Sequence, residues 1–242
     1  MTDAFVLPQT PITGAITTLR PKRSVLADDC HELIKARIMS HLIQPGERIN
    51  IEDLVRDLGV SQTPIREAMA RLESDGLVAK EPLRGYRATA PLNHKQLDDL
   101  YEFRFLIEPW GARLAAERIT DARRKAIMDE LATCPEAPTE RDYEISKTLS
   151  DHDARFHALI LSYSDNQLIV DAFERTHFHL HLFRLHYSPI SGTHAIEEHT
   201  ELAHAITSGN ADAAEAAMRH HLEESRERIV PSTDVFHIGA QP

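Results

Sequence analysis

Apolar residues recur at helical spacing in three stretches near the start of the chain. The first stretch covers 25–42 and the second covers 51–58, where Gly59 follows as a stop signal. The third begins after Ser61, a residue type that commonly caps a helix, and ends before Gly76. Because only a few residues separate the second and third predicted helices, the pattern predicts a helix-turn-helix.

The residues after the third predicted helix favour β-structure. Strand-like runs cover 77–80 and 86–89, and the segment between them carries Pro82, Arg84 and Gly85. The pattern therefore predicts a hairpin with a basic tip. Three helices followed by a hairpin make a winged helix-turn-helix, in which the third helix enters the major groove of DNA by its N-terminal end and the wing reaches phosphate or the minor groove.

The leading end of the third predicted helix carries Gln62, Thr63 and Arg66. Arg66 suits a bidentate contact with guanine or a contact with phosphate, and Gln62 suits adenine. Helix-turn-helix lookalikes and solvated arginines are common in helical proteins. The order of cap, proline, apolar stripe, glycine stop and basic hairpin is what favours DNA binding.

The rest of the chain has helical periodicity throughout and no alternating strand pattern. It predicts an all-α antiparallel helical bundle, so the fold class is mainly α, with an N-terminal winged helix-turn-helix and a C-terminal bundle. Six helices are expected in the bundle, over 93–119, 121–134, 140–163, 165–187, 192–208 and 211–230.

Charge divides the chain at the same place. Residues 1–93 carry 12 Lys and Arg against 12 Asp and Glu, whereas 94–242 carry 15 against 26, so the net charge of −11 lies in the second part. A neutral segment with basic clusters can approach a polyanion that an acidic segment repels. We therefore expect a flexible arm over 1–24, a DNA-binding domain over 25–91, a helical effector-binding and dimerisation domain over 93–230 and a tail over 231–242.

Composition indicates a cytoplasmic protein without membrane association. No N-terminal stretch pairs a basic flank with an apolar run of secretory length, and no window approaches the apolar span of a membrane helix. Cys30 and Cys134 lie far apart and in no paired spacing, which argues against a disulfide framework and a zinc knuckle.

Histidines are abundant, and one group of residues has ligand spacing. Asp153 and His157 are four residues apart, so their side chains project from one face of a helix. The segments 198–206 and 217–222 each place a histidine on an otherwise amphipathic helix. Imidazoles with one carboxylate suit zinc, nickel or manganese, although a histidine-rich chain also supplies such sets by chance.

The densest histidine run is HFHLHLFRLH, over 177–186. His177 and His181 share one helix face and are candidates for a pocket wall or an accessory ligand, whereas His179 and His186 fall elsewhere. An amphipathic packing helix with histidines on its polar side is the favoured interpretation. Arg184 or one of the histidines is a further candidate to line a pocket.

Four motifs in the first part resemble the GntR family of bacterial winged-helix transcription regulators: PGER at 45–48, LGVSQTPIREA at 58–68, RLE at 71–73 and DGLV at 75–78. The family usually has arginine where this chain has Gln62, so we expect this position not to read guanine with a guanidinium. With this resemblance, the expected DNA-contacting residues are Arg48, Ser61, Gln62, Thr63, Arg66, Arg71, Arg84 and Gly85.

The second part resembles the FCD effector domain of the fatty-acid-regulator-like (FadR-like) branch of that family. The matching segments include DDLYEFR at 98–104, Glu108, Asn166 and 209–222. In the metal-containing members of that domain, the ligands match residues that are all present here. The resemblance thus implies a divalent metal ion held by Asp153, His157, His199 and His221.

Arg104 has two candidate roles. It can pair with Glu108 one turn later, as an exposed helix pair worth ~0.3 kcal/mol. In the resembling domain, however, the matching arginine faces the effector cavity. A guanidinium beside an open metal position suits a small carboxylate, so we expect a small organic acid as the effector.

These features predict a transcription regulator and not an enzyme. We expect a homodimer whose winged domains bind the two halves of a palindromic double-stranded operator, with effector binding changing the DNA affinity. The resemblance implies release of DNA on effector binding, which is the behaviour of a repressor. Two alternatives remain open: a sensor for which the metal itself is the signal, and a metal-dependent hydrolase or lyase that uses the same four ligands.

Overall fold

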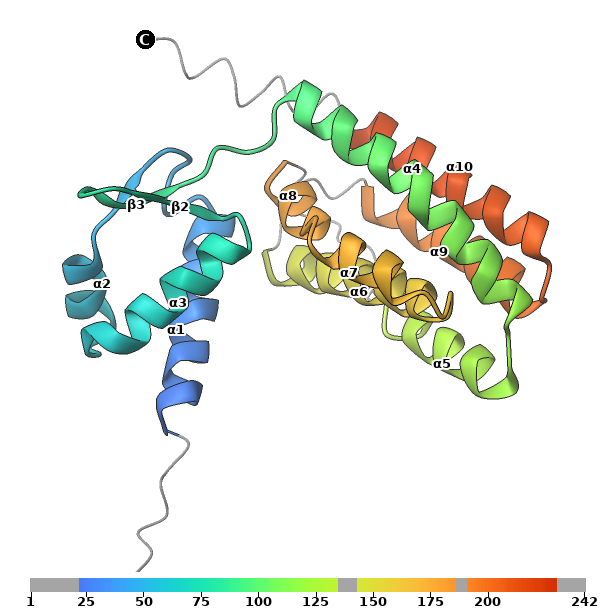
Figure 1. Cartoon of the computed structure of the whole chain (residues 1–242), viewed down its shortest axis with the longest axis horizontal. Helices are drawn as coiled ribbons and strands as arrows, with labels where there is room; N and C mark the ends of the chain where they lie inside the picture. Colours follow the sequence, from blue (N-terminus) through green and yellow to red (C-terminus); the bar gives the residue numbers. More distant parts are fainter. Residues whose placement is uncertain (1–21, 135–142, 186–190, 230–242) are drawn as a thin grey trace, which may run out of the picture.

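The structure is a computed structural model that describes residues 22–134, 143–185 and 191–229 (Figure 1). Within these ranges the chain forms ten helices and one three-stranded sheet, as the mainly α fold class predicts. The expected tail and His186 lie outside the described residues, as does the expected arm except for its last three residues. Those three residues belong to the first helix, which begins at Lys22.

The N-terminal domain is a winged helix-turn-helix. Its sheet has the antiparallel order β1-β3-β2, and β1, which the sequence does not predict, pairs Arg48 with Arg87. A strand of two residues is too short to show an alternating pattern, which explains why it was missed. The elements are α1 (Lys22–Met39), β1 (Arg48–Ile49), α2 (Ile51–Leu58), α3 (Gln62–Ser74), β2 (Val78–Glu81) and β3 (Gly85–Ala88).

Local signals fix the turn between α2 and α3. Asn50 caps α2 by accepting a hydrogen bond from the backbone of Glu52, and Gly59 ends the helix with a left-handed φ of 65°. Ser61 occupies the predicted N-cap position of α3, but its side chain makes no capping hydrogen bond. The buried face of α3 carries the predicted apolar stripe, all fully buried: Ile65, Ala68, Met69 and Leu72.

The first helix lies three residues earlier than the sequence predicts, at Lys22–Met39 instead of 25–42. Its end is marked by the Ser40 hydroxyl, which donates to the carbonyl of Ala36, and by a left-handed φ of 58° at His41. The hydroxyl of Ser40 thus competes with backbone N–H groups for the carbonyls of the last turn. The helix therefore ends before Pro45, the residue near which the sequence predicts its end.

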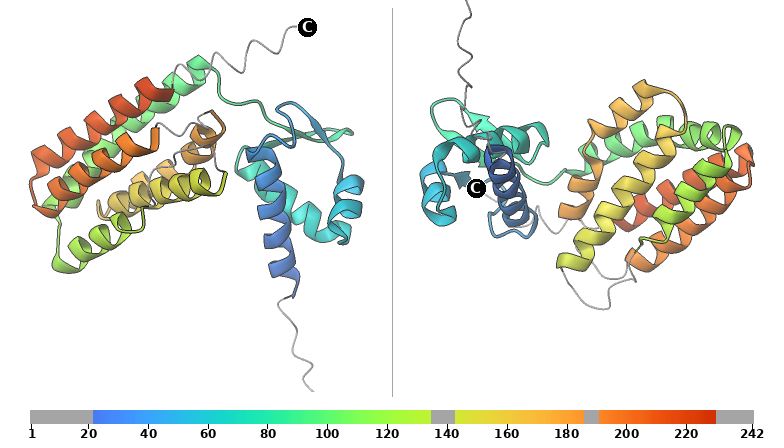
Figure 2. Two further views of the ribbon diagram at one scale, coloured as in Figure 1. Left: turned by 180° about the vertical axis from the view of Figure 1, so that it is seen from behind. Right: turned by 90° about the horizontal axis from the view of Figure 1, so that it is seen from below.

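The C-terminal domain is a helical bundle in which α4 and α10 lie side by side (Figures 1 and 2). Asn93 and Gln96 form a capping box at the start of α4. The core between the helices contains Phe156, Met218 and Leu222, which are fully buried. The elements are α4 (His94–Glu117), α5 (Asp121–Leu131), α6 (Tyr143–Ser162), α7 (Gln167–Glu174), α8 (Phe178–Leu185), α9 (Ser191–Thr207) and α10 (Ala211–Ile229).

The single helix predicted over 165–187 is wrong, because the chain forms two helices there. The hydroxyl of Thr176 donates to the carbonyl of Phe173 at 2.6 Å, and His177 has a left-handed φ of 44°. A threonine hydroxyl that bonds the preceding turn competes with the helical backbone pattern. The break lets α8 leave the line of α7 and reach the DNA-binding domain.

α8 packs against the N-terminal domain (Figure 1). Leu180 and Phe183 belong to the same hydrophobic cluster as Ile34 of α1 and Leu72 of α3. The two domains therefore share part of one core. None of the described helices combines the length and the apolar character that a membrane span requires.

Candidate metal centre and nucleic-acid interface

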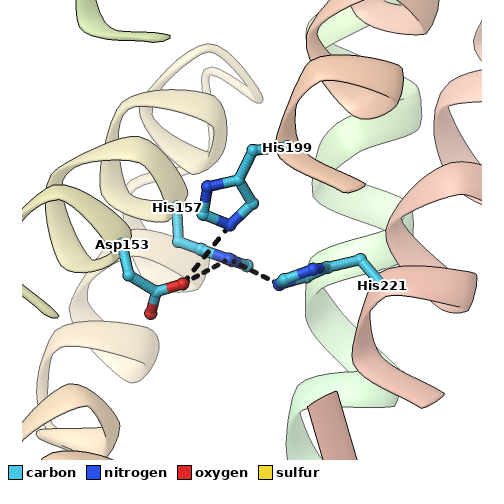
Figure 3. A group of neighbouring side chains, drawn as sticks. All are labelled: Asp153, His157, His199 and His221. Atoms are coloured by element: carbon cyan, nitrogen blue, oxygen red, sulfur yellow. Dashed lines mark hydrogen bonds and ion pairs between the residues drawn. The ribbon is translucent and has the colours of Figure 1, made fainter. Parts of the chain in front are cut away.

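Four side chains from three helices of the bundle converge at one point (Figure 3). Asp153 and His157 lie one turn apart on α6, His199 lies on α9 and His221 lies on α10. Each residue offers one ligand atom, and these atoms all lie within 4.8 Å of one another. The three imidazoles are buried, whereas Asp153 is partly exposed. The structure thus brings together the four residues that the sequence assigns to a metal site.

The Nε2 atoms of the three imidazoles face the centre of this cluster. Nε2 of His157 lies 3.1 Å from Nε2 of His221. Oδ1 of Asp153 lies 3.3 Å from Nε2 of His199 and 3.6 Å from Nε2 of His157. A metal ion that is roughly 2.1 Å from each ligand atom separates neighbouring ligand atoms by about 3 Å or slightly more. The spacing therefore fits a single ion.

Carboxylates hold two of the imidazoles from behind. Nδ1 of His157 donates to Oε2 of Glu108 at 2.6 Å, and Nδ1 of His221 donates to Oε2 of Glu198 at 2.8 Å. A carboxylate on Nδ1 places the ring proton there and leaves a lone pair on Nε2. The lone pairs of His157 and His221 then point at each other across 3.1 Å, which is repulsive unless a cation lies between them. This donor set fits a divalent ion.

His199 is held through a second histidine. Its Nδ1 lies 3.4 Å from Nε2 of His152, and Nδ1 of His152 lies 3.0 Å from Oε1 of Glu130. Nε2 of His199 is buried and is without a hydrogen-bond partner among the described residues, although Oδ1 of Asp153 lies 3.3 Å away. A buried nitrogen of this kind, directed at a carboxylate and two other imidazoles, is suited to bind a metal ion.

The charges around the cluster suit metal binding at neutral pH. Burial alone would raise the pKa of Glu108, but the charge of Arg104 and the contact with a ligand histidine lower it to about 2. Burial would also raise the pKa of Glu198, which hydrogen bonds with His221 and Arg228 lower to about 2. Burial lowers the pKa of His221 to about 3. The carboxylates are thus anionic and the imidazole neutral, which are the forms that bind a metal.

The exposed pair expected between Arg104 and Glu108 is wrong. Both side chains are fully buried, and Nε of Arg104 donates to Oε1 of Glu108 at 2.5 Å. The guanidinium also lies over the ring of Phe178, 3.9 Å from its centroid. The spacing of four shows that the two residues are neighbours on one face of α4. It does not show that α6 and α10 pack against α4, and so it does not predict that the pair is buried. Nη1 of Arg104 makes no hydrogen bond with a described residue.

The described part of the histidine run does not join the metal cluster. His177 precedes α8, while His179 and His181 lie within it and are partly buried. Burial is the main cause that lowers the pKa of both helical histidines to about 4. The ring of His181 lies 3.7 Å from the point where a Cβ on Gly76 would be, so the run packs beside the end of α3.

The candidate DNA-reading side chains stand at the leading end of α3. Gln62, Thr63 and Arg66 are exposed, and Nη2 of Arg66 donates to Oε1 of Gln62 at 3.4 Å. This long internal hydrogen bond is weak, so both side chains are available to bases or phosphates. Ser61, at the N-cap, is also exposed.

The other expected DNA contacts lie on the wing and at the far end of α3. Arg48 in β1 donates from Nε to the carbonyl of Arg84 at 2.8 Å, next to Gly85 at the start of β3. Arg71 forms an ion pair with Asp28 of α1. It is more than two turns from Gln62, so the structure separates Arg71 from the leading end where the other α3 residues gather.

Sequence reasoning missed the residues that support the metal ligands. Glu108 was seen only as a partner for Arg104, and His152 and Glu130 were given no role. Their contacts join helices that are far apart in the chain, so no local spacing points to them. The one usable signal is chemical: metal-bound histidines commonly donate their other ring N–H to a carboxylate.

Two family models match the chain. The model described as "Bacterial regulatory proteins, gntR family" matches residues 26–87, and that of the FCD domain matches residues 99–224. The first match covers α3 and most of the wing. The second contains the four residues of the metal cluster together with Glu108 and Glu198.

Similar proteins support the same assignment. YdhC of Bacillus subtilis, named an HTH-type transcriptional regulator, is 30% identical over 81% of this chain and 87% of its own length. The transcriptional repressor RspR of Escherichia coli is 27% identical over 88% of this chain and 92% of its own. The solved structure of E. coli McbR/YncC shares the fold, with a TM-score of 0.63 and 21% identity over 88% of this chain and 98% of that one.

Proposed function

Because the chain belongs to the GntR family of bacterial regulatory proteins and carries an FCD domain, we propose that it is a metabolite-controlled repressor. It is a DNA-binding transcription regulator and not an enzyme. The proposed effector is a small carboxylate that binds beside a divalent metal ion and releases the protein from a palindromic operator. The name of the relative RspR as a repressor supports this direction of control.

The metal cluster carries this proposal. Asp153, His157, His199 and His221 would hold zinc, nickel or manganese through one oxygen and three nitrogen atoms. The bound ion would supply a Lewis-acidic position that a carboxylate oxygen can occupy. The partial exposure of Asp153 gives an external ligand a side from which to approach.

Arg104 supports a carboxylate as the ligand. Its guanidinium is buried on the cluster side of α4. Burial would raise the pKa of Asp153, but the neighbouring His157 and His199 and the charge of Arg104 together lower it. Nη1 has no hydrogen-bond partner among the described residues. A buried N–H group without a partner is costly, and a ligand oxygen would satisfy it. The second ligand oxygen would then bind the ion.

α8 supports coupling between this site and DNA. Phe178, at the start of α8, packs edge-on against the ring of His157, and the two ring centroids are 5.7 Å apart. The guanidinium of Arg104 lies over the ring of Phe178. Farther along the same helix, Leu180 and Phe183 belong to the core of the DNA-binding domain. A ligand that displaces Phe178 would therefore move a helix that supports α3. Such differential contacts are what a coupling free energy requires.

We further propose a cytoplasmic homodimer. GntR-family regulators bind operators and often act as dimers. A two-fold dimer would present two copies of α3 to the two halves of a palindromic operator, and the spacing of the half-sites would follow the distance between these helices.

Adjacent histidines on α10 offer a matched test of the metal. His221 belongs to the cluster, whereas His220 is exposed. We expect His221→Ala to lose metal retention and metal-dependent stabilisation, and His220→Ala to keep both. Metal content after dialysis and melting temperature with and without chelator are the measurements. Equal metal content in the two variants would contradict the assignment.

A second experiment tests DNA binding. The probe is a duplex that the native protein selects from a random pool. We expect Arg66→Ala to bind this duplex roughly 10-fold or more weakly than the native protein does. Arg175→Ala, at an exposed arginine in the helical domain, is the control. Fluorescence anisotropy at fixed salt is the measurement. Titrating metal alone, and then metal with a series of organic acids, separates a metal sensor from a metabolite sensor.

A further inference from the structure

The turn at the tip of the wing has a leucine where glycine or asparagine is usual. The N–H of Arg84 donates to the carbonyl of Glu81 at 3.0 Å, which closes a four-residue turn with Pro82 second and Leu83 third. Leu83 has a left-handed φ of 62°, and its side chain is fully exposed. This conformation is unfavourable for a branched side chain. The isolated protein thus gains no packing from Leu83 and bears a conformational cost.

Basic side chains surround this apolar tip. Arg48, Lys80 and Arg84 are all exposed, and Nε of Arg48 donates to the carbonyl of Arg84 at 2.8 Å. The nearby carboxylate of Glu81 accepts a hydrogen bond from Nε of Arg87 at 2.8 Å, which offsets its charge. The wing tip is therefore cationic, with one large apolar side chain at its end.

The tip also faces the same way as the DNA-reading end of α3. In Figures 1 and 2, the turn that joins β2 and β3 and the beginning of α3 lie on the same side of the domain, away from the helical bundle. A duplex that receives Gln62 and Arg66 in its major groove thus passes the wing as well. Leu83, at this tip, is a large apolar side chain that is fully exposed to solvent.

We propose that Leu83 is an apolar wedge that enters the minor groove of bound DNA, while Arg48, Lys80 and Arg84 contact the flanking phosphates. This inference rests on the proposed DNA-binding function. Apolar side chains in the minor groove partly unstack a base step and kink the duplex. TA and CA/TG steps are the easiest to kink, so the wedge gives the protein a preference for such a step opposite the wing without hydrogen bonds to bases.

Two substitutions distinguish a role of Leu83 in DNA binding from a role in the stability of the fold. Leu83→Gly removes the side chain and relieves the left-handed conformation, so its melting temperature should equal or exceed that of the native protein. Leu83→Asn tolerates the same conformation but is polar. Leu168→Asn, at a leucine that is 78% exposed on α7, is the matched control in the helical domain.

The probe is a duplex that the native protein selects from a random pool, with a fluorophore pair at its ends and 2-aminopurine scanned along it. We expect both Leu83 variants to bind about tenfold more weakly and to lose the bend and the 2-aminopurine signal of unstacking. The salt dependence should stay native, because leucine neutralises no phosphate. Arg84→Gln should instead make the salt slope shallower by about one unit.

Native affinity and bending in both variants would overturn the wedge, and so would weaker binding with an unchanged bend and 2-aminopurine signal. A native protein that selects no duplex at all would instead reject the DNA-binding function on which the wedge depends. The failure of the wedge and the failure of the function are therefore distinguishable.

Discussion

Nη1 of Arg184 in α8 donates a 3.0 Å hydrogen bond to the hydroxyl of Thr89, and this hydroxyl donates to the carbonyl of Gly76 at 2.8 Å. Gly76 lies two residues after the end of α3, so two hydrogen bonds join the helical domain to the turn that follows this helix. Arg184 is almost completely buried and forms no ion pair with a carboxylate in the described ranges. Burial lowers its pKa to about 10. Burying a cation is costly unless hydrogen bonds compensate for its lost hydration. The hydrogen bonds from Arg184 to Thr89 supply this compensation at the contact between the two domains.

Replacing Arg184 tests this connection. We expect Arg184→Met to keep native metal affinity but to weaken the link between the domains, because the carbonyl of Thr89 loses a donor at a cost of about 1–3 kcal/mol. Metal should slow hydrogen exchange of the α3 amides in the native protein and have little effect on them in the variant. Arg175→Met, at an exposed arginine that follows α7, is the control. If metal slowed hydrogen exchange of the α3 amides equally in Arg184→Met and Arg175→Met, the domains would be coupled through contacts other than that of Arg184 with Thr89.

Glu108 is expected to tune the metal site without binding the ion. Glu108→Gln weakens the acceptor on Nδ1 of His157 and removes the charge beside Arg104. We expect metal affinity to fall roughly 10- to 100-fold, as for other residues that orient metal-bound histidines. Competition with a chelating dye measures this, with Glu102→Gln on the exposed face of α4 as the control. Unchanged affinity would leave Glu108 only a packing role.

Two partly buried histidines of α8 predict loss of stability in mild acid. Burial lowers the pKa of His179 and His181 to about 4, from 6.5 in a solvated chain. Between these values the unfolded chain binds protons that the folded protein does not, so stability falls as the pH decreases from 6.5 towards 4. The loss should be roughly 2 kcal/mol per histidine at pH 5.

Urea unfolding at pH 7 and pH 5 checks this expectation. The variant His179→Asn with His181→Asn should lose less stability over this range than the native protein, whereas His220→Asn, at an exposed histidine, should behave as native. A native pH dependence in the double variant would assign the effect to other groups.

Gly111 marks a close approach of α4 to α6. A Cβ at this position would lie 2.3 Å from Cδ2 of Leu161, which is fully buried. Alanine usually stabilises the middle of a helix by about 1 kcal/mol relative to glycine. Here we expect Gly111→Ala to destabilise the protein by about 1–3 kcal/mol through overpacking.

A double-mutant cycle supplies the control for Gly111. In the background Leu161→Ala, which removes the clashing atoms, the same Gly111→Ala change should cost less or become favourable. The free energy of unfolding from denaturant titrations is the measurement. A Gly111→Ala variant more stable than the native protein would mean that Leu161 adjusts easily.

Features that depend on neighbouring residues were predictable from the sequence. The turn between α2 and α3 follows from Gly59, and the apolar stripe of α3 from helical spacing. The placement of Asp153 and His157 on one helix face also follows from their spacing of four. The sequence placed histidines on the helical segments 198–206 and 217–222, but only the resemblance to the FCD domain singled out His199 and His221 as ligands, because no spacing rule joins α9 and α10 to α6.

The tertiary structure decided the rest. It buried the pair of Arg104 and Glu108 by packing α4 against other helices, and it placed carboxylates of α4 and α9 behind histidines of α6 and α10. It also broke the predicted helix at Thr176, which lets α8 join the two domains. The physical reason is common to all three. Periodicity reports which face of a helix is apolar, whereas the identity of the residues across that face depends on how distant segments pack.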